Sequence, residues 1–589
     1  MNTGTAQRSD GTAGLSRSPP AQNRRGRVPL VVGVTGHRDL LPAEEDLIRD
    51  RVRAFFLMLM GEFPDLPLLV MTPLAEGADR IAADVAHELG IPTVVLLPMP
   101  ERLYQSDFEG ESLTEFRSML SLGECVELPL LPDVDEEDVR RPGRARDYQY
   151  AQLGAYLAAH SHILLAIWDG RPSSAPGGTG HVIKFHQHDV IDLIAEGQHR
   201  SPIDFTEDES DLVYHIACSR REAGAPAEGL EPGAACWFTR DEIKPRTLYL
   251  PDRYRLVFER MSEFSRDLGA PMDPAVFTPL LPAEDLAACG EGVQDIDLLY
   301  HRADALSQKY QRYFHREIRG TLALGLLAGA SFVSYADWPG LGFMIYPYIA
   351  CIALVLVLAW LDGRYAWQRK AQDYRVLAEG LRVQFFWAVA GVRMENPSRF
   401  SHDSFLKRQD LELGWIRNVM RYAGFHADST DPGSTEAQIE LCTEHWVKDQ
   451  RDYYRRKAAE RATRHRITTS VELICFAGLL VAAGTLAVAR GLEGLVAQDV
   501  LIAFMGLLPF VIAARQNYAH RLAEREMMVQ YQHHIRIFSN AVNLMGRAPT
   551  PAVKLDILRA AGEAALEENG QWILRMRERP VAATHQVQG

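Results

Sequence analysis

The sequence predicts an α/β domain with a doubly wound, mostly parallel sheet, followed by an all-α membrane domain with four transmembrane helices. Two observations support this prediction. Between residues 28 and 218, short apolar runs alternate with helical stretches, as in parallel strands joined by crossover helices. In the C-terminal half, four longer apolar runs come in two pairs, and arginine and lysine flank each pair on its outer sides.

Composition limits the classes of function. The chain has 589 residues, enough for about three or four domains, and a formal net charge of −14. Because the chain is acidic, we expect no nucleic-acid partner. Its seven cysteines are scattered without a C-x-x-C pair, which argues against a zinc site or a disulfide framework and fits a reducing cytoplasm. Residues 1–27 lack an apolar core, so we expect a disordered tail rather than a signal peptide.

The first domain is expected to span residues 28–260. Its predicted strands are the apolar runs at residues 29–34, 66–71, 92–97, 125–128, 162–168 and 212–216. Helical stretches lie between them, at residues 42–61, 72–90 and 148–160. This alternation is typical of a Rossmann-like sheet. Residues 195–245 are rich in proline, glycine and acidic residues, and we expect an insertion or loop region there.

Three glycine-containing loops follow predicted strands, at the sheet edge where such folds bind ligands. The expected ligand-binding residues are Gly33, Thr35, Gly36, His37, Arg38, Glu76, Gly77, Asp79, Gly177, Gly178, Thr179 and Gly180. Glycines let backbone N–H groups approach a phosphate, and the N-terminus of the next helix favours its charge. Thr35 can donate a hydroxyl, and Arg38 can pair with phosphate or carboxylate. The alternative for each loop is a purely structural turn.

The combination of VGVTGHRDL, PLAEGADRIAADVA and PGGTG resembles the SLOG superfamily, over about residues 28–220. This Rossmann-like group includes the Lonely Guy phosphoribohydrolases and bacterial sensors of nucleotide-derived signals. The C-terminal half is similar to the SLATT group of SMODS- and SLOG-associating two-transmembrane effector domains, on WVKDQRDYYRRKA from Trp446 and AALEENGQWILRMRERP near the end. The resemblance implies a ligand sensor joined to a membrane effector, as proposed for bacterial conflict and anti-phage systems.

One motif departs from the Lonely Guy pattern P-G-G-x-G-T-x-x-E, whose glutamate serves catalysis. The chain has PGGTGHVIK at residues 176–184, so Lys184 stands at the position of the glutamate. This change favours binding over N-glycosidic hydrolysis, and we assign no catalytic residue. Glu76 and Asp79 are candidates for a replacement acid or for ribose contacts. The alternative is that both carboxylates only stabilise the N-terminus of the following helix.

The apolar runs at residues 321–336, 341–361, 467–489 and 497–514 are the predicted transmembrane helices, since a bilayer core takes about 20 apolar residues. Positive charge clusters before the first run, after the second, before the third and after the fourth. Because positive charge marks the cytoplasmic side, both hairpins should enter from the cytoplasm and return to it. We therefore expect a multi-pass protein of the bacterial inner membrane with both termini cytoplasmic. The alternative is four buried helices of a soluble protein.

Polar-to-amphipathic helices follow both hairpins, which indicates a diverged duplication. The predicted parts are a helical linker (261–318), the first hairpin (319–366), a cytoplasmic helical region (367–440), a long helix with the second hairpin (441–545), and a C-terminal helix with a tail (546–589). Gly325 and Gly329 permit close helix contact. His186, His188 and Asp189 are expected to form a solvated helix face rather than a metal site.

These patterns predict a protein that binds a nucleotide-derived small molecule through its N-terminal domain. The ligand would be NAD-like, ADP-ribose-like or a cyclic nucleotide. The four-span domain would then act on membrane integrity as a homo-oligomer in contact with the lipid bilayer. The rival interpretation is a membrane-tethered nucleotide hydrolase, acting as a phosphoribohydrolase or on NAD. A third interpretation is an inert structural anchor.

Overall fold

The computed structural model divides the chain into two compact units, Met1–Gly197 with Ser210–Leu250 and Gln198–Glu209 with Pro251–Gly589. The residues described are 27–131, 134–172, 177–188, 211–240, 245–270, 279–392, 411–428, 435–488 and 496–577. The predicted N-terminal tail, apart from Arg27, lies outside this range. The expected domain boundary at residue 260 falls inside a helix of the second unit, α8 (Asp252–Leu268).

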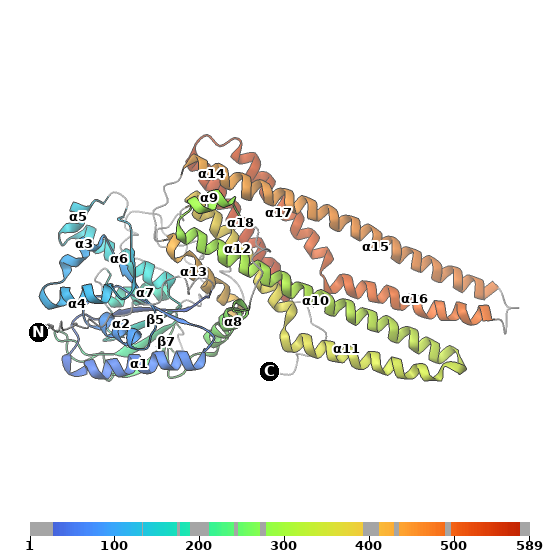
Figure 1. Cartoon of the computed structure of the whole chain (residues 1–589), viewed down its shortest axis with the longest axis horizontal. Coiled ribbons are helices and arrows are strands. Elements are labelled where there is room, and N and C mark those ends of the chain that lie inside the picture. Colours follow the sequence, from blue (N-terminus) through green and yellow to red (C-terminus); the bar gives the residue numbers. More distant parts are fainter. Residues whose placement is uncertain are drawn as a thin grey trace, which may run out of the picture. The chain divides into compact units, whose positions relative to one another are not determined.

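The first unit contains an eight-stranded sheet with the order β4-β3-β2-β1-β5-β6-β7-β8. Figure 1 shows this sheet with helices of the same unit, among them α1 and α6, packed around it. The strands are β1 (Leu30–Gly36), β2 (Leu68–Thr72), β3 (Thr93–Leu97), β4 (Glu124–Glu127), β5 (Ile163–Trp168), β6 (Val213–Ala217), β7 (Ala235–Phe238) and β8 (Arg246–Thr247). β1 to β6 pair in parallel, and each overlaps one predicted strand. All six residues of β5 and nearly all of β1 are buried, as expected for central strands covered on both faces. The doubly wound α/β prediction is confirmed.

Two strands were not predicted. β7 and β8 extend the sheet in the antiparallel direction from β6; β7 lies within the segment expected to be an insertion or loop, and β8 follows directly after that segment. The expectation of a loop there is wrong for the residues of β7 because Trp237 of β7 belongs to the core. Its ring is 1% exposed and lies 4.9 Å from the ring of Tyr214 and 5.9 Å from that of Phe55. Buried aromatic contacts of this kind stabilise a short edge hairpin despite its glycine- and proline-rich surroundings.

Helices cover both faces of the sheet and connect its strands. They are α1 (Glu45–Glu62), α2 (Ala78–Glu88), α3 (Glu101–Tyr104), α4 (Gly110–Leu120), α5 (Glu136–Arg140), α6 (Arg144–His160) and α7 (Thr179–His188). A glycine lets α2 pack directly on the end of β1, because a Cβ on Gly36 would lie 2.3 Å from the Cβ of Ala78. This close packing brings the loop after β1 next to the N-terminus of α2.

The described part of the second unit is helical. After α8 come α9 (Ala283–Ala288), α10 (Glu291–Asp337), α11 (Ile345–Tyr365), α12 (Trp367–Ala390), α13 (Gly414–Asp428), α14 (Glu436–Cys442), α15 (Asp449–Val488), α16 (Val496–Arg521), α17 (Glu524–Met545) and α18 (Pro551–Arg577). Short turns of 3-10 and π helix connect some of them, including η6 (Pro339–Met344) between α10 and α11.

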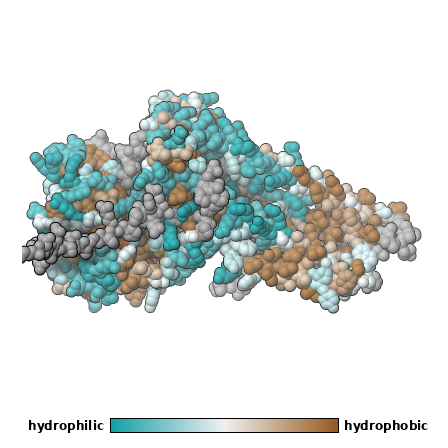
Figure 2. All heavy atoms as spheres, in the orientation of Figure 1, coloured by the Kyte–Doolittle hydropathy of each residue, from teal (hydrophilic) through white to brown (hydrophobic). Residues whose placement is uncertain are grey.

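Four candidate membrane spans lie within Glu291–Asp337, Gly340–Ala390, Glu436–Val488 and Val500–Met545, which agrees with the predicted number. Their apolar side chains are not core residues of a soluble bundle, because only 6% of the most apolar window is buried in the second and third spans. Leu480, for example, is 74% exposed. Figure 2 shows hydrophobic residues gathered over the two hairpins. Apolar surface of this extent is typical of helices that face lipid.

The helices repeat the same order twice. α10, α11 and α12 correspond to α15, α16 and α17, and the first helix of each set packs against the other two. An alanine with a left-handed backbone precedes the third helix of each set, Ala366 at φ 50° and Ala523 at φ 49°. An arginine lies two residues before each alanine, and a tyrosine lies eight residues after it. These matches support the predicted duplication.

Close contact between the two hairpins involves one of the two predicted glycines. A Cβ on Gly329 of α10 would lie 3.2 Å from the ring of Phe510 of α16, whereas a Cβ on Gly325 would meet nothing within 4 Å. Near the base of the hairpins, Arg521 forms an ion pair with the buried carboxylate of Glu317, with N–O distances of 3.1 and 3.2 Å. The two repeats are therefore joined both by apolar packing and by a charged contact.

Candidate functional site

A cavity of about 470 Å³ lies at the carboxyl ends of the parallel strands in the first unit. Loops that follow β1, β2, β5 and β6 line it, together with residues of α3, α6 and α7. The chain passes from β1 to β2 on one side and returns to β5 on the other side of β1. The cavity therefore lies at the position where the strand order reverses, which is the usual ligand-binding crevice of such sheets.

The structure brings most of the predicted ligand-binding residues to this cavity. Its lining includes Thr35, Gly36, His37, Arg38, Asp79, Gly177, Gly178 and Thr179. The other four, Gly33, Glu76, Gly77 and Gly180, do not line it. Gly33 instead packs against the segment before β5, since a Cβ there would lie 2.0 Å from Oγ of Ser161. Glu76 accepts a hydrogen bond from the Ser112 hydroxyl.

Gly77 does not line the cavity, but it lets the loop after β1 pack closely against the start of α2. Its φ of 77° is a left-handed conformation that favours glycine, and a Cβ there would lie 2.6 Å from the carbonyl oxygen of Arg38. The backbone N–H of Ala78 donates to the carbonyl oxygen of His37 at 3.2 Å. The loop that carries His37 and Arg38 is thus held against the start of α2.

Arg38 is the most informative residue of the site. Its guanidinium makes no hydrogen bond or ion pair with any described residue, although its side chain lines the cavity. The side chain is accessible to solvent, yet protein surrounds it on several sides, as expected for a group that faces a hollow. Burial lowers its pKa, but Tyr104, Tyr150, Asp107 and Asp79 outweigh that effect and raise it. A permanently charged, unpaired arginine in a cavity is a site for an anion.

Asp79 faces the same cavity from the N-terminus of α2. Its side chain is 3% exposed, one oxygen accepts the N–H of Ala75 at 3.3 Å, and Oδ1 has no hydrogen-bond partner in the described structure. Burial raises its pKa to about 7, against the opposing effect of Arg38. A carboxyl with this pKa can be protonated near neutral pH, so it can donate a hydrogen bond as well as accept one.

Two hydroxyls and a glycine loop complete the inner wall. Thr35 and Thr179 are mostly buried, line the cavity and make no side-chain hydrogen bond with the rest of the described structure. Gly177 has a φ of 68°, and a Cβ there would lie 2.6 Å from the Cβ of Tyr150. The carbonyl oxygen of Gly178 accepts the N–H groups of His181 and Val182 at 2.9 and 3.0 Å, as the first turn of α7 forms. This loop places a helix N-terminus at the cavity wall.

Charged pairs form one rim of the cavity. His37 Nε2 lies 3.1 Å from Oδ1 of the buried Asp169, and Arg220 donates to Asp39 at 2.9 Å. Burial lowers the pKa of His37, although the neighbouring carboxylate of Asp169 opposes this effect. Asp169 and Asp39 thus lie beside His37 and Arg220, although Nε2 of His37 makes no hydrogen bond within the described residues. The rim is therefore preorganised, whereas Arg38 remains available.

Several lining residues were not predicted from the sequence. Asp169 and Arg220 each follow a predicted strand closely, so the position after a strand end was a usable signal for both. Tyr104 and Tyr150 come from α3 and α6 and carry no such signal. Their ring centroids lie 6.4 Å apart; Tyr104 is 1% exposed and belongs to the core, so Tyr150 is the ring that adds aromatic surface to the cavity. A cation and helix N–H groups next to an aromatic ring can accommodate a ligand with both a phosphate and a flat base.

Lys184 and His186 do not line the cavity. Lys184 is exposed on α7. His186 is buried, and its two ring nitrogens lie 3.2 Å from the carbonyl oxygens of Ala158 and Leu212. The expectation that His186 lies on a solvated helix face is therefore wrong, because its ring is buried between α6 and the residue that precedes β6. Asp189 lies outside the described residues.

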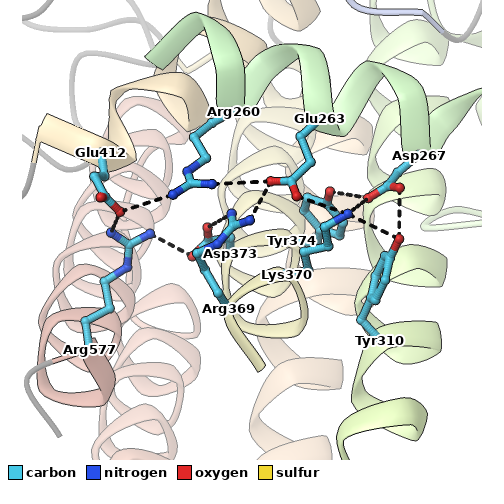
Figure 3. Close-up of polar contacts among 10 residues, drawn as sticks. All are labelled: Arg260, Glu263, Asp267, Tyr310, Arg369, Lys370, Asp373, Tyr374, Glu412 and Arg577. Atoms are coloured by element: carbon cyan, nitrogen blue, oxygen red, sulfur yellow. Dashed lines mark hydrogen bonds and ion pairs between the residues drawn. The ribbon is translucent and has the colours of Figure 1, made fainter. Parts of the chain in front are cut away.

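A second group of polar residues joins α8 to α12 in the second unit (Figure 3). Lys370 lies 2.8 Å from Asp267 and 3.1 Å from Glu263, and Arg369 donates to Glu263 at 2.5 Å. The two cations outweigh the effect of burial and lower the pKa of Glu263. The sequence offered no indication of this cluster, because its members are about 100 residues apart in the chain.

The hydroxyls of Tyr310 and Tyr374 also donate to Asp267, at 2.8 and 2.6 Å. On the other side of the cluster, Arg577 of α18 contacts Asp373 and Glu412 at 3.0 and 3.2 Å (Figure 3). The network thus connects α8, the first helix after the α/β unit, to α10, α12 and α18. We refer to Glu263, Asp267, Arg369 and Lys370 as the α8–α12 cluster.

The chain matches no protein-family model and no curated protein. The chemistry of the cavity and the arrangement of the helices therefore carry the functional argument.

Proposed function

We propose that the chain is a membrane-anchored sensor and effector. Its α/β unit would bind a nucleotide-derived small molecule, and its four-span domain would act on membrane integrity as a homo-oligomer. The observation that carries this proposal is Arg38, an unpaired guanidinium facing a cavity that glycine loops and a helix N-terminus also line.

The lining fits a phosphorylated nucleoside. Arg38 and the start of α7 offer charge and N–H donors to a phosphate. Oδ1 of Asp79, which has no partner in the described residues, can accept a hydrogen bond from a ribose hydroxyl. Tyr150, which is partly exposed at the cavity, offers ring surface to a base. Candidate ligands are therefore NAD-like, ADP-ribose-like or cyclic nucleotides, in line with the resemblance to SLOG sensors.

The α8–α12 cluster is the proposed mechanical link. α8 begins at Asp252, directly after the α/β unit ends at Leu250. Its carboxylates hold the start of α12, whose preceding helix α11 is a candidate span. A change in the α/β unit that displaces α8 would therefore also displace the start of α12 and, with it, the first hairpin. A ligand can drive such a change only if it binds the two states with different affinity.

The anti-phage or conflict role comes from the resemblance to SLOG and SLATT proteins, and it is part of the proposal. In such a system the ligand would be made during infection, and the bacterial inner membrane would be the target. The expected orientation has both termini in the cytoplasm, where a nucleotide signal can reach the cavity.

Calorimetry on the full chain in a neutral detergent tests the binding step. ADP-ribose, NAD and a cyclic dinucleotide are compared with adenosine, which lacks phosphate. At least one phosphate-containing compound should bind and adenosine should not. Arg38→Gln should weaken that binding by about tenfold or more, because it removes a charge-assisted contact. Binding of none of the compounds, or equal binding by the variant, would refute the proposed site.

One observation favours the rival enzyme. Asp79 is a buried carboxyl with a pKa raised to about 7 in a cavity, which is a property of general acids. A nucleotide hydrolase would release free base from nucleoside monophosphates, or nicotinamide from NAD. Our proposal expects no such release by the full chain. Turnover of about 1–10³ per second that Asp79→Asn abolishes would establish the enzyme instead.

A further inference from the structure

A second cavity, of about 860 Å³, lies inside the second unit. It is enclosed by α10 and α12 of the first repeat, α15, α16 and α17 of the second repeat, and the C-terminal end of α18. Its lining residues on α10, α15 and α16 come from the parts next to the apolar runs. The cavity is therefore placed at the boundary between the membrane-spanning and polar parts of the helices.

The charge of this cavity is strongly positive. Six arginines line it, namely Arg319, Arg375, Arg461, Arg464, Arg515 and Arg521, but only two glutamates do. Glu524 is already bonded to Arg515 at 2.9 Å. Arg521 is paired with Glu317, outside the lining. The excess of positive charge is thus carried by the remaining arginines.

Four of these arginines make no hydrogen bond or ion pair with any residue that the structure describes. They are Arg319, Arg375, Arg461 and Arg464. Two are held in place by aromatic rings, since the guanidinium of Arg375 lies 5.5 Å from the ring centre of Trp572 and that of Arg461 lies 5.2 Å from Tyr531. Arg515 adds a buried Nη1 without a partner. Like charges gathered in one hollow repel one another, so an anion between them would relieve that repulsion.

The remaining lining is apolar. Phe314, Ile467, Leu522, Met527 and Met528 contribute side chains beside the arginines. A phosphate ester attached to an apolar tail matches both parts of this surface. Basic pockets between transmembrane helices at the cytoplasmic boundary bind phospholipid head groups in this way.

We propose that this cavity binds a phosphate ester and that the ester is the head group of an anionic phospholipid. The phosphate lies between arginines of the first repeat and arginines of the second, so the lipid joins the two repeats. The acyl chains run along the exposed apolar surface of the hairpins. This site is separate from the nucleotide cavity, and it does not depend on the proposed function of the α/β unit.

The chain offers a matched pair of variants. Arg319→Gln with Arg464→Gln removes two unpaired charges from the cavity. Arg316→Gln with Arg466→Gln removes two exposed arginines from the same two helices, and neither of these lines the cavity. Both double variants change the net charge equally. Thermal midpoints in neutral detergent establish that both remain folded, which is expected because none of the four side chains is bonded to a described residue.

Native mass spectrometry of the full chain in neutral detergent measures lipid retention, with phosphatidylglycerol and phosphatidylcholine as probes. The parent should retain phosphatidylglycerol in preference to phosphatidylcholine. The cavity variant should retain at least about tenfold less phosphatidylglycerol than the parent, whereas the control variant should retain as much as the parent. Equal retention of the two lipids by the parent, or equal loss in both variants, would overturn the proposal.

Competition with glycerol 3-phosphate identifies the source of the phosphate. If the bound ligand is a lipid, the soluble ester at the same concentration should leave phosphatidylglycerol in place, because it lacks the apolar tail. Displacement that the cavity variant abolishes would keep the phosphate-ester site and assign it to a soluble compound rather than to a lipid.

Discussion

The ammonium nitrogen of Lys370 in α12 lies 2.8 Å from Oδ2 of Asp267 in α8. The same carboxylate accepts hydrogen bonds from Tyr310 and Tyr374 (Figure 3). One side chain of α8 therefore contacts both the polar part of α10, which precedes the first span, and the start of α12, which follows the first hairpin. Contacts of this kind are expensive to break, because a largely buried ammonium and two hydroxyls lose their acceptor together.

The first prediction concerns Asp267→Ala. It should lower the unfolding free energy of the full chain by about 2–3 kcal/mol, because charge-assisted hydrogen bonds are lost and Lys370 keeps Glu263 and a 3.5 Å contact with the hydroxyl of Tyr310. Thermal unfolding in detergent measures the effect. Glu259→Ala, which removes an exposed carboxylate from the same helix, should change the midpoint little. Equal effects of the two substitutions would show that the α8–α12 cluster contributes nothing.

Gly36→Ala should destabilise the α/β unit rather than act on ligand binding alone. Its Cβ would lie 2.3 Å from that of Ala78 and 3.0 Å from the carbonyl oxygen of Ile167, so α2 must move away from β1. Such overpacking costs about 1–3 kcal/mol. Gly61→Ala, at a helical position with nothing within 4 Å, should be neutral or stabilising. An unchanged thermal midpoint for Gly36→Ala would contradict this close packing.

Asp79→Asn should stabilise the ligand-free chain at neutral and higher pH. The folded-state pKa of Asp79 is raised from 3.8 to about 7, chiefly by burial. Below pH 3.8 the carboxyl is protonated in both states; as the pH rises toward 7, only the unfolded state ionises freely, so stability is lost. The asparagine escapes this loss, which is on the order of 2–4 kcal/mol.

Thermal midpoints of parent and Asp79→Asn measured at about pH 4 and about pH 8 test this sign. The difference between the two proteins should be small at the lower pH and large at the higher. Asp50→Asn, an exposed position on α1, serves as the control and should show no such trend. A benefit of Asp79→Asn that is largest at the lower pH would mean that folding lowers the pKa of Asp79 instead of raising it.

Reporter fusions test the predicted orientation. A fusion at Gly340, in the short connection between α10 and α11, should report the periplasmic side. Fusions at residues 28, 400 and 589 should report the cytoplasmic side, because arginine and lysine flank the bases of both hairpins. A cytoplasmic signal at Gly340 would rule out the hairpin topology.

Much of the fold followed from hydrophobic patterning. The buried parallel strands are continuous apolar runs, which is why β1 and β5 were predicted within two residues of their ends. β7 escaped prediction because a four-residue strand, anchored mainly by Trp237, leaves no periodic pattern. The spans were predictable because lipid requires length and apolarity.

The site was predictable only in part. Arg38 and Asp79 were found because they stand in glycine loops directly after strands. That Arg38 lacks a partner, and that Oδ1 of Asp79 is unsatisfied, depends on tertiary packing, which no local pattern records. The same holds for the α8–α12 cluster and for the basic cavity, whose residues are brought together from helices far apart in the sequence.

Ligand-dependent dye release from liposomes that contain the full chain tests the central claim most directly. The nucleotide identified by calorimetry should trigger release by the parent. A folded Arg38→Gln variant lacks only a guanidinium that has no partner among the described residues. It should insert equally well and release little dye. Release by this variant equal to that of the parent, at a ligand concentration where calorimetry shows no binding, would contradict the account and separate the two units in function.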